Sequence, residues 1–173
     1  MADLSGVLTR SVVCSLQGHD NRINSLAWHS SHRHLASCGY DSTVRVWCPE
    51  TGALEQTFVY RKSLAVYGSE LHGELISHLS WSASGRYLSA AMQASLNIWH
   101  LNEDGKVSGE CFIDSDTDWI TAVCWPTTRQ NLEEGESCLV GCVNGIVSLI
   151  TVRHTMFNKL ELINASQPNG KAN

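Results

Sequence analysis

The fold of this chain is decided by residues 17–48, QGHDNRINSLAWHSSHRHLASCGYDSTVRVWC. Within it, TVRVW at 43–47 alternates apolar and polar residues, and a period of two is typical of a β-strand. The preceding Tyr40-Asp41-Ser42 has turn chemistry, because a short Asp side chain can hydrogen-bond its own backbone. Short strands that recur with turns about every 8–12 residues predict an antiparallel sheet.

An internal repeat appears when residues 17–48 are slid along the sequence. Placing Trp28 on Trp81 leaves no gap as far as residue 88, and after the loss of one residue Trp47 falls on Trp99. The same slide superimposes His19 on His72, Ile23 on Ile76, Leu26 on Leu79, Arg33 on Arg86 and Leu35 on Leu88. A second slide places Trp81 on Trp125, Ile76 on Ile120 and Leu79 on Val123.

The polar signature of the first copy decays along the chain. The second copy has Ala90 for Ser37 and Gln93-Ala94 for Tyr40-Asp41. The third has Asp116 for His19, Gly141 for Ser37, Asn144 for Asp41 and Ile150 for Trp47. Asn144-Gly145 still predicts a two-residue hairpin, because both residues accept a positive φ.

The sequence therefore predicts three four-stranded antiparallel sheets preceded by one extra outer strand at 11–16. The expected strands lie near 22–28, 34–39, 43–48 and 53–59, near 75–81, 86–91, 95–101 and 107–113, and near 119–125, 137–143, 146–152 and 157–163. Two exposed connectors are expected at 60–71 and 126–136, an N-terminal arm at 1–10 and a disordered tail at 164–173.

Residues 17–48 resemble a WD40 repeat, with Gly18-His19, Ser37, Asp41 and Trp47 in order and at the spacing of that family. Cys48 departs from the family pattern, which has Asp after the Trp. The resemblance covers 11–163, with repeats near 17–59, 70–113 and 116–163. It implies an all-β fold, a partial WD40 β-propeller, and a non-catalytic module that binds other proteins.

Three sheets do not close a ring, since propellers have about 4–8 blades. An open arc exposes apolar faces and strand edges. The chain is therefore expected to be a fragment of a longer propeller, a splice product or a chain completed by a partner. On its own it is expected to form an oligomer or an aggregate.

Composition excludes several classes of protein. The 173 residues carry a net charge of −5, with Lys and Arg scattered singly, so no basic patch for nucleic acid is present. No apolar segment is long enough for a membrane span, and no secretory signal is recognised at the N-terminus. Seven cysteines without a CxxC pair favour reduced thiols in a cytoplasmic or nuclear protein and indicate no zinc site.

His19, Ser37 and Asp41 superficially resemble a hydrolase triad. Catalysis by such a triad needs an exposed nucleophile and an oxyanion hole. In the WD40 family these positions, with Trp47, form a buried hydrogen-bond chain, so the resemblance implies a structural network. No catalytic residue and no cofactor are assigned.

Three histidines, His29, His32 and His34, fall within six residues and could hold a transition metal. They lie in an expected turn without a neighbouring Cys or carboxylate, which favours an exposed polar turn. A hydrolase or metal-dependent activity at His19 or at this cluster is kept as the alternative function.

The family binds partners through the face that carries the Gly-His and Asp turns. Carried over by position, the partner-binding candidates are Asn21, Arg22, Tyr40, Glu74, Leu75, Gln93, Asp118, Trp119 and Val143. Trp28, Trp81 and Trp125 are expected in the core. Trp119, at the start of an innermost strand, is either an interface anchor or packs on a neighbouring blade.

The preferred function is a scaffold that recruits protein partners to a larger intracellular complex. A ubiquitin ligase, a trafficking assembly and a chromatin assembly are equally compatible with the sequence.

Overall fold

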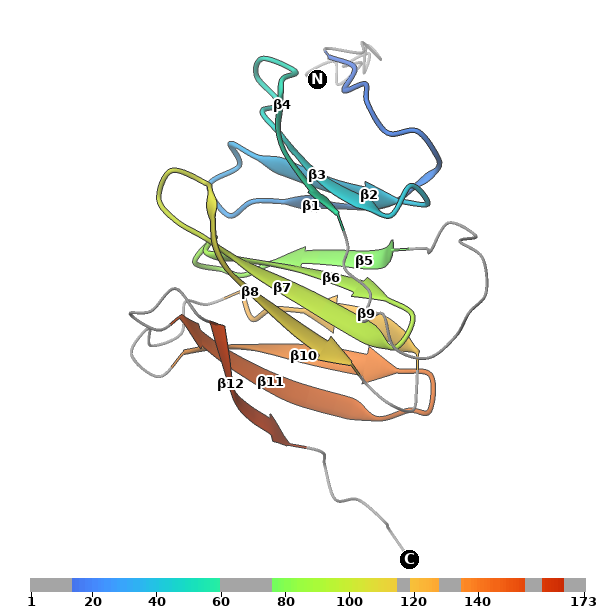
Figure 1. Cartoon of the computed structure of the whole chain (residues 1–173), viewed down its shortest axis with the longest axis vertical. Helices are drawn as coiled ribbons and strands as arrows, with labels where there is room; N and C mark the ends of the chain where they lie inside the picture. Colours follow the sequence, from blue (N-terminus) through green and yellow to red (C-terminus); the bar gives the residue numbers. More distant parts are fainter. Residues whose placement is uncertain (1–13, 60–75, 115–118, 128–134, 155–159, 167–173) are drawn as a thin grey trace, which may run out of the picture.

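The computed structural model describes residues 14–59, 76–114, 119–127, 135–154 and 160–166, with backbone only for the last segment. Three four-stranded antiparallel sheets are stacked in sequence order, as Figure 1 shows. In each sheet the strands pair in the order in which they occur in the chain. The sequence prediction of an all-β, partial propeller is confirmed.

Each sheet is named here as a blade. Blade 1 contains β1 (Ile23–Trp28), β2 (Leu35–Gly39), β3 (Thr43–Trp47) and β4 (Leu54–Val59). Blade 2 contains β5 (Ile76–Trp81), β6 (Tyr87–Met92), β7 (Ser95–Leu101) and β8 (Val107–Asp114). Blade 3 contains β9 (Ile120–Cys124), β10 (Glu136–Cys142), β11 (Val147–His154) and β12 (Leu160–Ser166).

The prediction of an extra outer strand at 11–16 is wrong for residues 14–16, which are the part of it that the structure describes. Residues 14–16 form no strand, while residues 11–13 lie outside the described residues. A Cβ atom placed on Gly52 would lie 2.9 Å from the Cys14 sulfur, so this segment runs beside the β3–β4 turn. A strand needs an edge to pair with, and the sheets of the described part begin only at β1.

Two expected boundaries also shift. The tail was expected to begin at 164, but β12 continues to Ser166, with Asn164 opposite Thr151 and Ser166 opposite Leu149. The exposed connector 126–136 was expected to include Glu136, which instead begins β10 and is only 3% exposed. The Ser84 hydroxyl donates a hydrogen bond to its carboxylate at 2.6 Å, which offsets the cost of burial.

The core lies between the blades. The trailing face of a blade is defined here as the face toward the next blade in the chain, and the leading face as the face toward the previous one. The first joint packs the trailing face of blade 1 on the leading face of blade 2; its residues include Ala36, Cys38, Val44, Val46, Leu79, Trp81, Leu88 and Trp99. The second joint packs blade 2 on blade 3 through Ala91, Leu96, Ile98, Val123, Trp125, Cys138 and Ile150, among others.

The prediction that all three repeated tryptophans are core residues is wrong for Trp28. Trp81 and Trp125 are 9% and 7% exposed, whereas Trp28 is 54% exposed. The three residues occupy the same position in the repeat: Trp28 and Trp81 end the first strand of their blades, and Trp125 directly follows it. Trp28 differs because no described sheet covers the leading face of blade 1.

The β10–β11 hairpin also differs from the two-residue turn that the sequence predicts. Cys142 N donates to Ile146 O and Gly145 N donates to Cys142 O, which closes a three-residue loop. Gly145 has φ 83°, while Asn144 does not have a positive φ. This is the type I turn followed by a left-handed residue that three-residue hairpins use.

The strand pairing shows that the residue equivalent to Ser37 in the third copy lies one position from the residue that the sequence comparison gave. Leu26 pairs with Ser37, and its repeat equivalent Val123 pairs with Val140. Val140, rather than Gly141, therefore occupies the position of Ser37. An apolar residue there gives the third copy no hydroxyl for the polar network.

Candidate functional site

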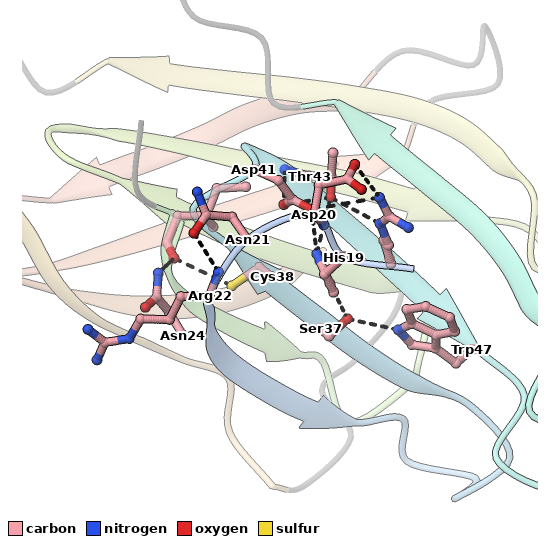
Figure 2. Close-up of polar contacts among 12 residues, drawn as sticks. His19, Asp20, Asn21, Arg22, Asn24, Ser37, Cys38, Asp41, Thr43 and Trp47 are labelled. Atoms are coloured by element: carbon pink, nitrogen blue, oxygen red, sulfur yellow. Dashed lines mark hydrogen bonds and ion pairs between the residues drawn. The ribbon is translucent and has the colours of Figure 1, made fainter. Parts of the chain in front are cut away.

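In blade 1, His19 connects the Gly-His loop to strand β2 and to the β2–β3 turn. His19 Nε2 lies 2.6 Å from Ser37 Oγ on β2, and His19 Nδ1 lies 2.7 Å from Asp41 Oδ2 in the β2–β3 turn. The Trp47 indole N–H on β3 donates to Ser37 Oγ at 2.8 Å. Figure 2 shows His19 between Ser37 and Asp41, with the Trp47 indole on the far side of Ser37.

One assignment of protons gives a partner to each of the side-chain polar atoms that link Trp47, Ser37, His19 and Asp41. The Trp47 N–H donates to Ser37 Oγ, the Ser37 hydroxyl donates to His19 Nε2, and a proton on His19 Nδ1 reaches the Asp41 carboxylate. The His19 and Asp41 side chains are only 4% and 8% exposed. A fully satisfied buried network of this kind stabilises one arrangement of the backbone.

Asp41 receives further hydrogen bonds that the sequence analysis did not identify. The Thr43 hydroxyl and N–H donate to its Oδ1 at 2.8 and 3.2 Å, and the Asp20 N–H donates to its Oδ2 at 3.2 Å. Burial raises the pKa of Asp41, but the hydrogen bonds from His19, Thr43 and Asp20 outweigh burial and hold that pKa below its ordinary value. The Asp-x-Thr spacing of a side-chain turn is the signal that could have identified Thr43.

Arg45 is a second residue that sequence reasoning missed. Its guanidinium lies 3.7 Å from Asp41 and 3.7 Å from Asp20. Its position two residues after Thr43 on a strand places both side chains on the same face of the sheet. The Gly-His loop is therefore held by a cation as well as by His19.

The geometry does not fit the hydrolase interpretation. Ser37 is 3% exposed, and its oxygen already accepts the Trp47 N–H, so a substrate carbonyl has no approach to it. A catalytic serine must be reached by its substrate.

The histidines at 29, 32 and 34 do not converge on a common point. His29 Nδ1 lies 2.8 Å from Ser31 Oγ, and its Nε2 lies 3.1 Å from the Gly85 carbonyl oxygen. His34 Nδ1 lies 2.7 Å from Glu55 Oε2. In the described part of the chain, no group of three or more His, Cys, Asp or Glu side chains could hold a metal ion.

Two of the partner-binding candidates meet on blade 1. The Arg22 guanidinium lies over the Tyr40 ring, 5.7 Å from its centre, and Tyr40 N donates to Arg22 O at 2.9 Å. Gly39 allows this approach, because a Cβ there would lie 2.3 Å from the Arg22 carbonyl oxygen. Asn21 is exposed beside them, and its Oδ1 accepts the Arg22 N–H (Figure 2).

Blade 3 repeats this arrangement with apolar side chains. Val143 N donates to Trp119 O at 2.9 Å, the same bond that joins Tyr40 to Arg22 in blade 1. Trp119 is 63% exposed and Val143 is 65% exposed. Gln93 O accepts the Ile120 N–H, so the exposed Gln93 of blade 2 adjoins this pair. Of the alternatives for Trp119, its exposure disfavours packing on a neighbouring blade within the described chain.

The other candidates cannot be placed. Glu74, Leu75 and Asp118 lie outside the described residues. The described candidates therefore form two groups, Asn21–Arg22–Tyr40 and Gln93–Trp119–Val143, at the starts of innermost strands and at the β2–β3, β6–β7 and β10–β11 turns.

Comparison with known proteins gives the family. The WD domain, G-beta repeat family matches residues 10–48, the stretch that carries the Gly-His loop and the hydrogen-bond network. The chain therefore contains a WD40 repeat. Proteins of this family are typically non-catalytic and bind protein partners.

The relatives extend this match beyond one repeat. The chain is 35% identical over 86 residues to a probable cytosolic iron-sulfur protein assembly protein, Ciao1, of Culex quinquefasciatus, covering 49% of this chain and 23% of that protein. It is 27% identical over 124 residues to a ribosome biogenesis protein WDR12 homolog of Nematostella vectensis, covering 70% of this chain and 26% of that protein. This WD40 chain thus spans about a quarter of the length of each of these relatives.

A solved structure shows the same fold. The crystal structure of the RRP9 WD40 repeats matches 87% of this chain and 40% of its own, with a TM-score of 0.61 and 14% identity. At that identity the likeness concerns the fold alone. In the described part of this WD40 protein, no helix is long and apolar enough to cross a membrane.

Proposed function

We propose that this WD40 protein is a non-catalytic scaffold that recruits a protein partner to a larger intracellular assembly. The observation that carries the proposal is the exposed pair of Trp119 and Val143 at the start of β9 and the β10–β11 turn. Together with Gln93 it is called here the blade 3 rim.

The chemistry of the blade 3 rim suits a protein interface. An exposed tryptophan is a favoured interface anchor, because its large rigid side chain buries much apolar surface at a small entropic cost. Two backbone hydrogen bonds hold the rim together, because the Val143 N–H and the Ile120 N–H donate to the carbonyl oxygens of Trp119 and Gln93. A preorganised surface loses less entropy on binding than a flexible one.

The names of the relatives support a role in an intracellular assembly process. The two compared relatives are named for iron–sulfur protein assembly in the cytosol and for ribosome biogenesis. These names support the proposal that this chain works in the cytoplasm or the nucleus. Ubiquitin ligase, trafficking and chromatin assemblies are the other settings that the sequence allows.

The experiment compares wild type with Trp119→Ala by proximity labelling in cells and by affinity capture with mass spectrometry. We expect a reproducible set of proteins with wild type, and at least a tenfold loss of one or more direct partners with Trp119→Ala. Loss of a hot-spot tryptophan costs about 2 kcal/mol or more, which exceeds a tenfold change in affinity.

The matched control is Val107→Ala on β8, an exposed apolar residue away from the rim. It should retain every partner, and both variants should melt at the wild-type temperature. Retention of all partners by a well-folded Trp119→Ala variant contradicts the proposed rim.

A further inference from the structure

The two joints between blades are built in the same way. In each, the first strand of the later blade lies against the earlier blade, with β5 against β1 and β2, and β9 against β5 and β6. The innermost tryptophan of the later blade is buried in the joint in both cases, as Trp81 and as Trp125. The joint is thus a repeated unit, with a trailing face and a leading face as its two halves.

The tryptophan of each joint also makes a polar contact with the earlier blade. The Trp81 indole N–H donates to Ala27 O at 3.2 Å, and the Trp125 indole N–H donates to Ser89 Oγ at 3.0 Å. In the first joint, Leu79 N donates to Ser25 Oγ at 3.3 Å. A leading face is therefore covered by the apolar trailing face of another blade. That trailing face also supplies a hydrogen-bond acceptor for the tryptophan, on or beside its innermost strand.

In the part of the chain that the structure describes, one leading half-joint is uncovered, at the first blade. Trp28 is the repeat equivalent of Trp81, and Leu26, which is 60% exposed, is the equivalent of the buried Leu79. These two residues define the head face. The equivalent residues of blades 2 and 3 are buried in the core of a joint. An exposed apolar surface at this position therefore suits contact with another sheet better than contact with water.

Among the described residues, one trailing half-joint is likewise uncovered, at the third blade. Leu139, Val147 and Leu149 are exposed on the side of β10 and β11 that faces away from blade 2, and Leu139 pairs with Leu149. These three residues define the tail face. In the register of the repeat they correspond to Ala36, Val44 and Val46, which form the trailing half of the first joint.

We propose that the head face of one copy of this chain binds the tail face of a second copy. The contact continues the joint already made twice within the chain. The Cys124 carbonyl, in the position of Ala27, is the acceptor that the tail face offers to the Trp28 indole of the second copy.

Two such contacts close the assembly. A head-to-tail interface gives a ring when the rotation closes and a filament when it does not. Two copies contribute six blades, which lies within the range of about 4–8 blades that propellers use. Closure leaves neither apolar face exposed to water.

The test measures the mass of the purified chain in solution by light scattering across about 1–100 µM, a range typical of dimer measurements. We expect twice the 19.0 kDa of one chain. Leu26→Glu in the head face and Leu149→Glu in the tail face should each raise the dimer dissociation constant more than about tenfold, because either buries an unpaired carboxylate. Val107→Glu is the control, since Val107 is exposed on β8 outside both faces.

A mixing experiment makes the test specific. Neither Glu variant can form an intact joint with itself, but the tail face of Leu26→Glu fits the head face of Leu149→Glu. An equimolar mixture should therefore recover a dimer through one intact joint. The milder pair Trp28→Ala and Val147→Ser gives the same prediction should a Glu variant fail to fold.

Three results would overturn the proposal. The first is a wild-type chain that is monomeric over the whole range, which points to further blades of a longer chain as the cover. The second is a dimer that survives both variants. The third is a mass that climbs with concentration, which contradicts closure. Trp119→Ala should leave the dimer unchanged, so this proposal and the proposed scaffold function fail separately.

Discussion

His19 Nε2 lies 2.6 Å from Ser37 Oγ, and the two residues come from different segments of blade 1. The contact fixes the loop before β1 against β2, and the same imidazole reaches Asp41 in the β2–β3 turn through its other nitrogen. A single ring thus connects the Gly-His loop to β2 and to the β2–β3 turn. Removing it should loosen all of them together.

His19→Ala should lower the free energy of unfolding by about 2–4 kcal/mol, because the buried Ser37 hydroxyl loses its acceptor and the buried Asp41 carboxylate loses one of its donors, at about 1–3 kcal/mol each. Urea unfolding monitored by tryptophan fluorescence measures the loss. The control is His34→Ala, which breaks the exposed His34–Glu55 pair and should cost under about 1 kcal/mol. Equal costs for the two variants would contradict a structural role for His19.

Asp41 should make blade 1 sensitive to acid. Its folded pKa lies below its ordinary value of about 3.9, so its contribution to stability is fully present above that value. The contribution is lost as the pH falls through the folded pKa, since the unfolded state binds the proton first. Asp41→Asn should therefore be less stable than wild type at pH 7, with the gap narrowing below about pH 4. A gap that stays constant down to pH 2 would contradict this assignment.

Gly39 should tolerate no side chain. A Cβ there would lie 2.3 Å from the Arg22 carbonyl oxygen, which is backbone and cannot move without separating β1 from β2. We expect Gly39→Ala to cost about 3 kcal/mol. Gly145→Ala is the matched control: it meets no atom within 4 Å and carries only the strain of φ 83°, about 1 kcal/mol. Thermal melting of both variants gives the comparison.

The cysteines should differ in their reaction with iodoacetamide. Burial raises the pKa of Cys38 and of Cys138 to about 12, so both should stay unlabelled in the folded chain at pH 8. Hydrogen bonds from Thr51 lower the pKa of Cys48, which should label faster than the exposed Cys14. Peptide mass spectrometry over time measures the rate at which each cysteine is labelled. Thr51→Val should slow the labelling of Cys48 and leave the rates of the other cysteines unchanged.

Much of the blade pattern could be predicted from the sequence, because strand alternation and turn residues are local signals. The slide that placed Trp28 on Trp81 also predicted the strands of blades 1 and 2. The sequence comparison could not predict features that depend on how strands pair, such as the length of a hairpin loop. Asn144-Gly145 is compatible with two hairpin lengths, and the choice depends on how β10 and β11 pair.

The candidate site was predictable in part for the same reason. His19, Ser37, Asp41 and Trp47 follow a family spacing, and the structure joins them by hydrogen bonds. Arg45 lacks such a signal, because an arginine on a strand reads as a solvated residue until its neighbours are known. Its ion pairs depend on how the Gly-His loop folds over blade 1.

The sequence by itself determined that the chain repeats one antiparallel blade and that the first copy holds the polar network. Only the tertiary structure decided which repeated residues are buried. Trp28, Trp81 and Trp125 are the same residue at the same position in the repeat, yet only the last two are covered. Local pattern sets which side of a strand is apolar, but burial depends on the sheet that lies against it.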